Sequence, residues 1–177
     1  MKLILERWKG FLNEQNYTIP HGEIVSSVNR ALQILQLTNA NLRQFLIEIA
    51  VMESGGNPKG IDKITHHVPN PFQIMGGALQ LTQATWKLKK LRDRISTNAK
   101  LSNPWSEQSI EEVRSNSRMG ALAASLWIIH KMNPDKQALD ATIPGSVAER
   151  AALWKAIYNT SADPHGTAEI YIRKNSL

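Results

Sequence analysis

Apolar residues recur at the spacing of an α-helix along most of this chain. Intervals of three and four residues repeat from the N-terminal region to the C-terminus, and each set would bury one face of a helix. The positions concerned are Leu5, Trp8 and Leu12; Ile24, Val28, Ala31, Leu32 and Leu35; Leu42, Phe45, Leu46 and Ile49; Ala84, Leu88, Leu91 and Ile95; Leu122, Leu126, Trp127 and Ile129; Ala151, Trp154 and Ile157; and Ile170 and Tyr171. The pattern predicts a mainly α protein with about seven or eight helices and little strand.

Polar residues mark several boundaries of these helices. The cluster at residues 38–41 supplies capping side chains for the helix that follows, and residues 109–112 and 146–149 have the spacing of capping boxes. Residues 57–76 are rich in proline and glycine, which predicts a long loop or a short β-like excursion. The run from Met119 to Met132 is apolar nearly all round and is expected to be the central buried helix. A single domain spanning residues 1–177 suits this length.

Glu53 is the most informative residue of the chain. It takes the next position on the apolar face predicted for residues 42–49, and the helical pattern breaks directly after it at Gly55, Gly56 and Pro58. Glycine accepts left-handed backbone angles and proline cannot continue a helix, so we expect Glu53 in the last helical turn. A carboxylate held among apolar side chains is desolvated, which favours its protonated form, the form that a general acid needs. The alternative is a solvated carboxylate at a helix end.

Three segments match the motifs of a known superfamily. Glu53, Ser54 and Pro58 stand at the spacing of a Glu-Ser-x-x-x-Pro motif, and Gly77 to Gln80 form a Gly-x-x-Gln segment. Residues 157–161, Ile-Tyr-Asn-Thr-Ser, match in part an Ala-Tyr-Asn-Ala-Gly-like stretch. Over residues 40–175 the chain thus resembles the lysozyme-like superfamily, in particular its branch of lytic transglycosylases and goose-type lysozymes.

This resemblance implies a lysozyme-like fold and an enzyme that cleaves the β-1,4 bond between MurNAc and GlcNAc in peptidoglycan. In lytic transglycosylases one glutamate acts first as acid and then as base, and Glu53 would take that role here. The N-acetyl group of the substrate assists departure of the leaving group, and the 6-hydroxyl of the muramic acid then closes on C1. The product carries a 1,6-anhydro end, and no cofactor is implied.

The same resemblance suggests roles for four further residues. Ser54 would help to orient the acid, Gln80 would offer its amide to the sugar, and Tyr158 and Asn159 would position the acid and line the cleft. Gln73, in the segment Pro-Phe-Gln-Ile-Met, is a competing glutamine in a similar local context. Each residue type also has an ordinary structural role, as a hydroxyl that caps the backbone, a satisfied amide or a core aromatic.

Two other functions remain open. A muramidase that hydrolyses the same bond would use a second carboxylate, and Asp62 in the following loop is the nearest candidate, although aspartate is also common in turns. A catalytically silent structural or polyanion-binding protein on the same scaffold would use a basic helix. The residues of that basic helix are Lys87, Lys89, Lys90, Arg92 and Arg94.

Composition and charge exclude few classes of binding partner. A net charge of +6 and a pI near 9.7 favour acidic partners; with the resemblance, the expected partner is a peptidoglycan strand and not nucleic acid, and we expect a monomer. The chain has no cysteine, so it has neither disulfides nor thiolate metal sites. His66 and His67 near Asp62 lack the His-Glu-x-x-His spacing, so no metal site is predicted.

The N-terminal residues do not have the pattern of a secretory signal. Charges interrupt the apolar run of residues 1–8, no small-residue cleavage site follows, and no run is long enough to span a bilayer. A cell-wall enzyme would then need another route to its substrate. We expect a holin-dependent phage endolysin, a virion component or the cargo of a secretion system, with a phage origin preferred.

Overall fold

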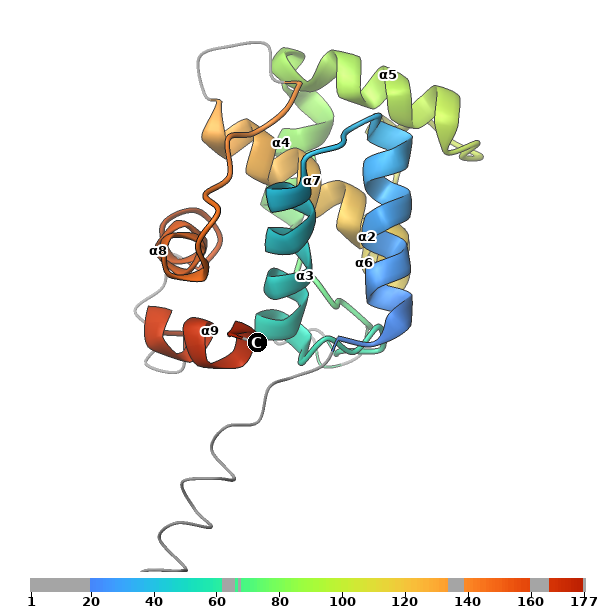
Figure 1. The fold of residues 1–177 in the computed structure, drawn as a ribbon. Coiled ribbons are helices and arrows are strands. Elements are labelled where there is room, and N and C mark those ends of the chain that lie inside the picture. Colours follow the sequence, from blue (N-terminus) through green and yellow to red (C-terminus); the bar gives the residue numbers. More distant parts are fainter. Residues whose placement is uncertain (1–19, 62–65, 67, 134–138, 160–165, 177) are drawn as a thin grey trace, which may run out of the picture.

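The computed structural model describes residues 20–61, 66, 68–133, 139–159 and 166–176. The described part contains eight α-helices, which confirms the prediction of a mainly α chain with seven or eight helices (Figure 1). The helices are α2 (Gly22–Leu35), α3 (Ala40–Ser54), α4 (Gly76–Ala84), α5 (Lys89–Asn98), α6 (Ile110–Ser115), α7 (Ser117–Met132), α8 (Val147–Ile157) and α9 (Ala168–Asn175), with short 3-10 turns η1 (Trp86–Leu88) and η2 (Trp105–Glu107). The helix expected around residues 5–12 lies outside the described residues.

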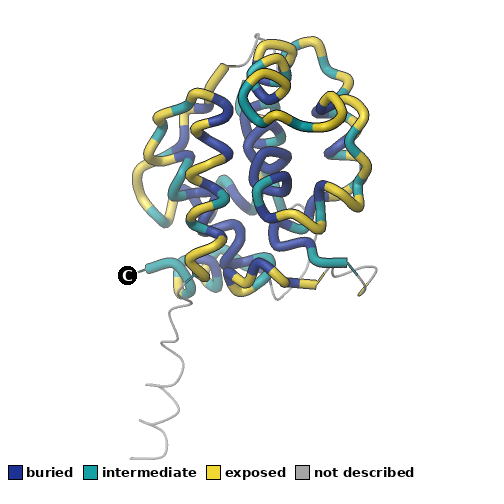
Figure 2. The backbone as a smooth tube through the Cα atoms, turned by 90° about the vertical axis from the view of Figure 1, so that its right-hand side faces the viewer, coloured by how far each residue is buried: buried dark blue, intermediate teal, exposed yellow. Residues whose placement is uncertain are grey.

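Helix α7 is the centre of the molecule. Eleven of its sixteen residues are buried, as predicted from its uniformly apolar sequence. It contacts α2, α3, α4 and α6. Figure 2 shows buried stretches in the interior of the molecule and exposed stretches mainly at its periphery. Gly120 lets the Phe72 ring, from the loop between α3 and α4, pack on α7, because a Cβ atom at position 120 would lie 3.0 Å from that ring.

Helix α3 begins and ends where the sequence predicts. The Asn39 side chain accepts a hydrogen bond from the Leu42 amide at 2.9 Å and so caps the N-terminus. At the other end Gly55 and Gly56 have φ values of 66° and 70°, the left-handed region that glycine enters without a steric penalty. Glu53 therefore lies in the last turn of a helix that has a long buried stretch behind it.

The loop between α3 and α4 contains an isolated antiparallel bridge, between Ile61 and Pro69, and no longer strand pairing among its described residues. Asn70 organises the far end of this loop because its buried side chain accepts from the Ile74 amide at 2.7 Å and donates to the Ile74 carbonyl at 3.1 Å. The bridge and this side chain fold the loop back toward the end of α3.

The single helix expected over residues 84–95 is wrong. Helix α4 already begins at Gly76, the backbone is extended at Thr85, and α5 starts only at Lys89. Arg92 accounts for the break, since its Nη1 donates to the carbonyls of Thr82 and Thr85 at 3.1 and 2.5 Å. These carbonyls at the end of α4 are thus satisfied by a side chain rather than by a continued helix.

The two predicted capping boxes have different outcomes. Ser109 and Glu112 exchange both hydrogen bonds at the start of α6, so this box is confirmed. Ser146 accepts from the Glu149 amide, but the Glu149 carboxylate binds the Ser146 hydroxyl at 2.5 Å rather than its amide. Only the N-cap of α8 is therefore as predicted.

The basic residues of α5 are partly structural. Arg94 donates to the Leu35 carbonyl at 2.7 Å and Asn98 donates to the Ile34 carbonyl at 2.8 Å, which joins α5 to the C-terminal end of α2. Lys89 pairs with Asp93 at the exposed surface. Within the described residues, none of the helices has the length and hydropathy required to cross a bilayer.

Candidate active site around Glu53

Glu53 is half-buried at the end of α3, where α8 covers it from one side. The indole of Trp154, which is 1% exposed, donates its Nε1 hydrogen to Glu53 Oε1 at 3.1 Å. A hydrogen bond from a buried ring fixes the direction of the carboxylate. The two residues are 101 positions apart, so this contact depends on the tertiary fold.

Tyr158, directly after α8, is the second aromatic residue next to this carboxylate. Its hydroxyl donates to the carbonyl of Phe72. Burial, together with the negative charge of Glu53, raises the pKa of Tyr158 well above its ordinary value. Tyr158 therefore remains protonated at neutral pH and keeps its hydrogen bond to the loop between α3 and α4.

Asn159 lies at the same end of α8. Its backbone N–H donates to the Trp154 carbonyl at 2.9 Å. Its side chain lies against Gly166, where a Cβ atom would come within 2.3 Å of Asn159 Nδ2. Trp154, Tyr158 and Asn159 thus lie together at one end of α8, whereas Thr160 and Ser161 lie outside the described residues.

Ser54 contacts its own helix. Its hydroxyl donates to the Ala50 carbonyl at 2.9 Å. This is the ordinary structural role of a serine hydroxyl, which was the alternative to a role in orienting Glu53. The loop also packs on this side chain, because a Cβ atom on Gly60 would lie 2.2 Å from Ser54 Cβ. Ser54 therefore supports the end of α3 from which Glu53 projects.

The two candidate glutamines occupy different places. Gln73 is half-buried, and its Nε2 donates to the carbonyls of Ile61 at 3.0 Å and Asn70 at 2.9 Å. Its φ of 48° is in the left-handed region, an uncommon conformation for a residue other than glycine and one that is enriched at functional sites. Gln80 is exposed on α4 and does not line the cavity described next.

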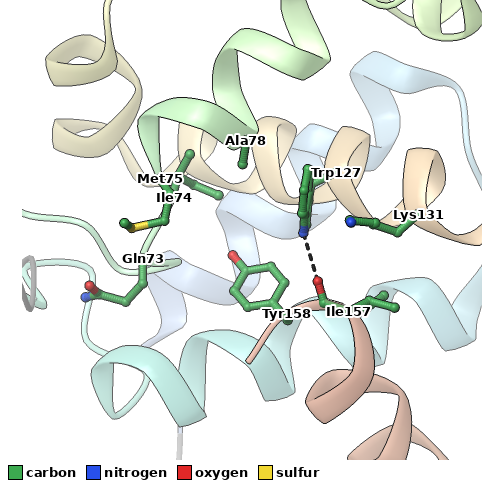
Figure 3. A pocket seen from close by; sticks show the side chains of 8 residues that line it. All are labelled: Gln73, Ile74, Met75, Ala78, Trp127, Lys131, Ile157 and Tyr158. Atoms are coloured by element: carbon green, nitrogen blue, oxygen red, sulfur yellow. Dashed lines mark hydrogen bonds between the residues drawn. The ribbon is translucent and has the colours of Figure 1, made fainter. Parts of the chain in front are cut away.

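A cavity of about 360 Å³ opens beside Tyr158, between the start of α4, the C-terminal half of α7 and the end of α8 (Figure 3). Figure 3 shows Tyr158 between Gln73 on one side and Trp127 with Lys131 on the other. The lining residues are Gln73, Ile74, Met75, Ala78, Trp127, Lys131, Ile157 and Tyr158. Trp127 Nε1 donates to the Ile157 carbonyl at 3.1 Å, so this wall joins α7 to α8.

A second carboxylate on α3, Glu48, was not singled out in the sequence. It is 1% exposed and accepts from Arg150 Nε at 2.7 Å, Arg150 Nη2 at 2.6 Å, the Tyr171 hydroxyl at 2.6 Å and Gln44 Nε2 at 3.0 Å. The hydrogen bond with Glu48 raises the pKa of Arg150, against the effect of burial. Four donors compensate this charge, so Glu48 has the surroundings of a structural ion pair.

Trp154 was also missed as a site residue, although its inward position on α8 was predicted from periodicity. Arg150 and Trp154 are one helical turn apart on α8, and they contact Glu48 and Glu53, which both belong to α3. The Trp154 and Tyr171 rings lie 5.4 Å apart, which adds α9 to this arrangement. No local sequence signal could reveal pairs that are more than a hundred residues apart.

The remaining candidates are the possible second carboxylate and the histidines near it. Asp62 and His67 lie outside the described residues. Among the residues that the structure describes, no three or more His, Cys, Asp or Glu side chains gather where they could hold a metal ion.

Comparison of the chain with protein-family models, with curated proteins and with solved structures gives no significant match. Indications of function therefore come from the geometry around Glu53 and from the sequence motifs.

Proposed function

We propose that this protein is a peptidoglycan-cleaving lytic transglycosylase that acts on the β-1,4 bond between MurNAc and GlcNAc. The observation that supports this most is the setting of Glu53, a half-buried carboxylate at the end of a buried helix, oriented by Trp154 at 3.1 Å and close to Tyr158, which lines the cavity. General acids of glycosidases have this combination of partial desolvation, fixed orientation and access to substrate.

In the proposed reaction, protonated Glu53 gives its proton to the glycosidic oxygen while the bond from C1 to that oxygen breaks. The N-acetyl carbonyl oxygen of the substrate forms a bond to C1 and holds the developing positive charge. The Glu53 carboxylate then takes the proton of the C6 hydroxyl as O6 attacks C1 and displaces the acetamido oxygen. Glu53 ends protonated, and no water is consumed.

Other residues of the site would act through position. The protonated Tyr158 holds the loop between α3 and α4 against α8, and Ser54 supports the last turn of α3. We assign the glutamine that borders the cleft to Gln73 in preference to Gln80, because Gln73 lines the cavity and Gln80 does not. Asn159 would line the same end of the cleft.

The polyanion-binding alternative loses part of its support. It rested on five basic residues, yet Arg92 and Arg94 are used to satisfy backbone carbonyls and Lys89 pairs with Asp93. Under the proposal the protein acts on the cell wall, delivered as an endolysin, a virion component or a secreted cargo.

The first prediction is that Glu53→Gln lowers peptidoglycan cleavage by about a hundredfold or more, since a positioned general acid contributes roughly 10²–10⁴-fold. Released muropeptides measured by mass spectrometry would report both rate and product. Glu107→Gln, an exposed carboxylate on η2, serves as the matched control and should leave the rate unchanged.

The products separate the mechanisms. Anhydromuramic ends that the wild type forms and Glu53→Gln does not would support the transglycosylase. Reducing ends would favour a muramidase and direct attention to Asp62. Equal release by the wild type and Glu53→Gln would refute the catalytic assignment, and no release by either would favour the silent scaffold.

A further inference from the structure

The cavity beside Tyr158 has a mostly apolar lining with a positive charge at one edge. Most of its lining is apolar or aromatic, including Trp127 and the 46% exposed Met75. Its one charged group among the described lining residues is the ammonium of Lys131, and none of them is acidic. A pocket of this kind favours a ligand with an apolar body and a negatively charged end.

Lys131 is exposed, and its ammonium lies over the aromatic wall of the cavity. Its Nζ lies 4.6 Å from the centroid of the Trp127 ring, within the range of a cation–π interaction. Trp127 is itself fixed by its hydrogen bond to the Ile157 carbonyl. The ammonium therefore has a defined place at the edge of the cavity, as Figure 3 shows.

A second lysine, Lys87 of η1, acts on the same end of α7. Burial, followed by the charges of Lys87 and Lys131, lowers the pKa of His130, so both lysines act on this ring while it stays neutral at pH 7. The local field at this end of α7 is thus positive and is reinforced from η1. Such a field attracts carboxylates.

We propose that this cavity receives the peptide stem of the substrate, with a stem carboxylate bound by Lys131 and the apolar part of the stem packed against Trp127 and Met75. The inference rests on the proposed function, because Tyr158 is common to the cavity and to the surroundings of Glu53. A stem attached to the sugar next to the cleaved bond would then determine which strands are processed.

The test compares cleavage of stem-bearing strands with cleavage of strands whose stems an amidase has removed. Lys131→Met keeps the length of the side chain over Trp127 and removes the charge. It should lower kcat/KM for stem-bearing strands by about two- to fivefold, the size expected for one exposed ion pair, mainly through KM, and leave stem-free strands unaffected. Lys90→Met removes the same charge from the exposed face of α5 and should change neither value.

Three outcomes would overturn the inference: an equal effect of Lys131→Met on both substrates, no effect on either, or an effect confined to stem-free strands. The last would indicate that Lys131 binds the free lactyl carboxylate that amidase treatment exposes. Calorimetric binding of a stem-bearing muropeptide in the Glu53→Gln background separates this inference from the proposed function. Binding there that depends on Lys131, without cleavage by the wild type, would refute the function and leave the binding site standing.

Discussion

At the scale of single residues, the position of Glu53 depends on a close approach between Gly60 and Ser54. The loop after α3 turns back onto the helix, and there is no room for a side chain at position 60, since a Cβ atom would lie 2.2 Å from Ser54 Cβ and 3.0 Å from the Asn57 carbonyl oxygen. Neither neighbour is the free end of a flexible side chain. Because Gly60 has no side chain, the loop can pack directly on the last turn of α3.

We expect Gly60→Ala to destabilise the protein by about 1–3 kcal/mol, the usual cost of an extra methyl group in a tightly packed place. Because the displaced atoms adjoin Glu53, cleavage should fall under conditions where the variant is still folded. Urea unfolding and muropeptide release would measure the two effects. Gly22→Ala is the matched control: nothing lies within 4 Å of a Cβ atom there, and alanine in helix α2 should be neutral or slightly stabilising. Equal behaviour of the two variants would contradict this account.

At the scale of elements, α3 and α8 are joined at two points by side chains one turn apart on α8. Arg150 binds the buried Glu48, and Trp154 binds the half-buried Glu53. The first contact stabilises the pairing of the helices, and the second uses that pairing to orient the acid. Tyr171 of α9 also donates to Glu48, so three helices meet at one carboxylate.

Arg150→Met should cost about 3–5 kcal/mol, because it leaves the Glu48 carboxylate buried without its cation. The double variant Glu48→Leu with Arg150→Met should be more stable than Arg150→Met alone, since both charges are then absent. Free energies of unfolding in urea would complete this double-mutant cycle. Lys89→Met, which breaks the exposed pair with Asp93, provides the control and should change stability by less than about 1 kcal/mol. Additive single effects of Glu48→Leu and Arg150→Met would show that the pair is not coupled.

At the scale of the whole molecule, two tyrosines, Tyr171 in the core and the half-buried Tyr158, make global stability sensitive to alkaline pH. Burial is the main cause that raises the pKa of both Tyr158 and Tyr171, with nearby Glu53 and Glu48 adding to it. A folded state that holds a proton more tightly than the unfolded state keeps this stability below the unfolded pKa and loses it as pH rises. For tyrosine the loss begins near pH 10.

We expect the free energy of unfolding to fall as the pH rises above about 10, and Tyr171→Phe to make this fall shallower by about 1.4 kcal/mol per pH unit, the contribution of one proton. The slope is the quantity to compare, because Tyr171→Phe also removes a hydrogen bond to Glu48 at every pH. Urea unfolding between pH 8 and 11 would measure it. Identical slopes for the two proteins would refute the role assigned to Tyr171.

Local rules predicted the parts of this fold that local residues determine. The cap at Asn39, the end of α3 at Gly55 and the burial of α7 all follow from residues a few positions apart. The break at Thr85 did not, because Arg92 satisfies the carbonyls at the end of α4 from α5. A helical periodicity can continue across such a break.

The candidate site was predictable to a similar degree. Glu53 could be found because its helix and its helix stop are both visible in the sequence. Its partner Trp154 could be placed on an inward face but not paired, because the distance along the chain is 101 residues. Gln73 and Gln80 could not be ranked, since only the folded loop brings Gln73 to the cavity.

The hydrogen bond between Trp154 and Glu53 also gives this protein an internal optical probe. The fluorescence emission of an indole depends on the charge of the group that accepts a hydrogen bond from its ring nitrogen. We therefore expect the fluorescence of Trp154 to change when Glu53 gains or loses its proton. Trp127 and Trp105 differ, since Trp127 donates to a carbonyl and the buried ring nitrogen of Trp105 has no hydrogen-bond partner among the described residues. The difference in emission between the wild type and Trp154→Phe would thus report the ionisation of the proposed acid in the resting protein, without substrate and without an added label.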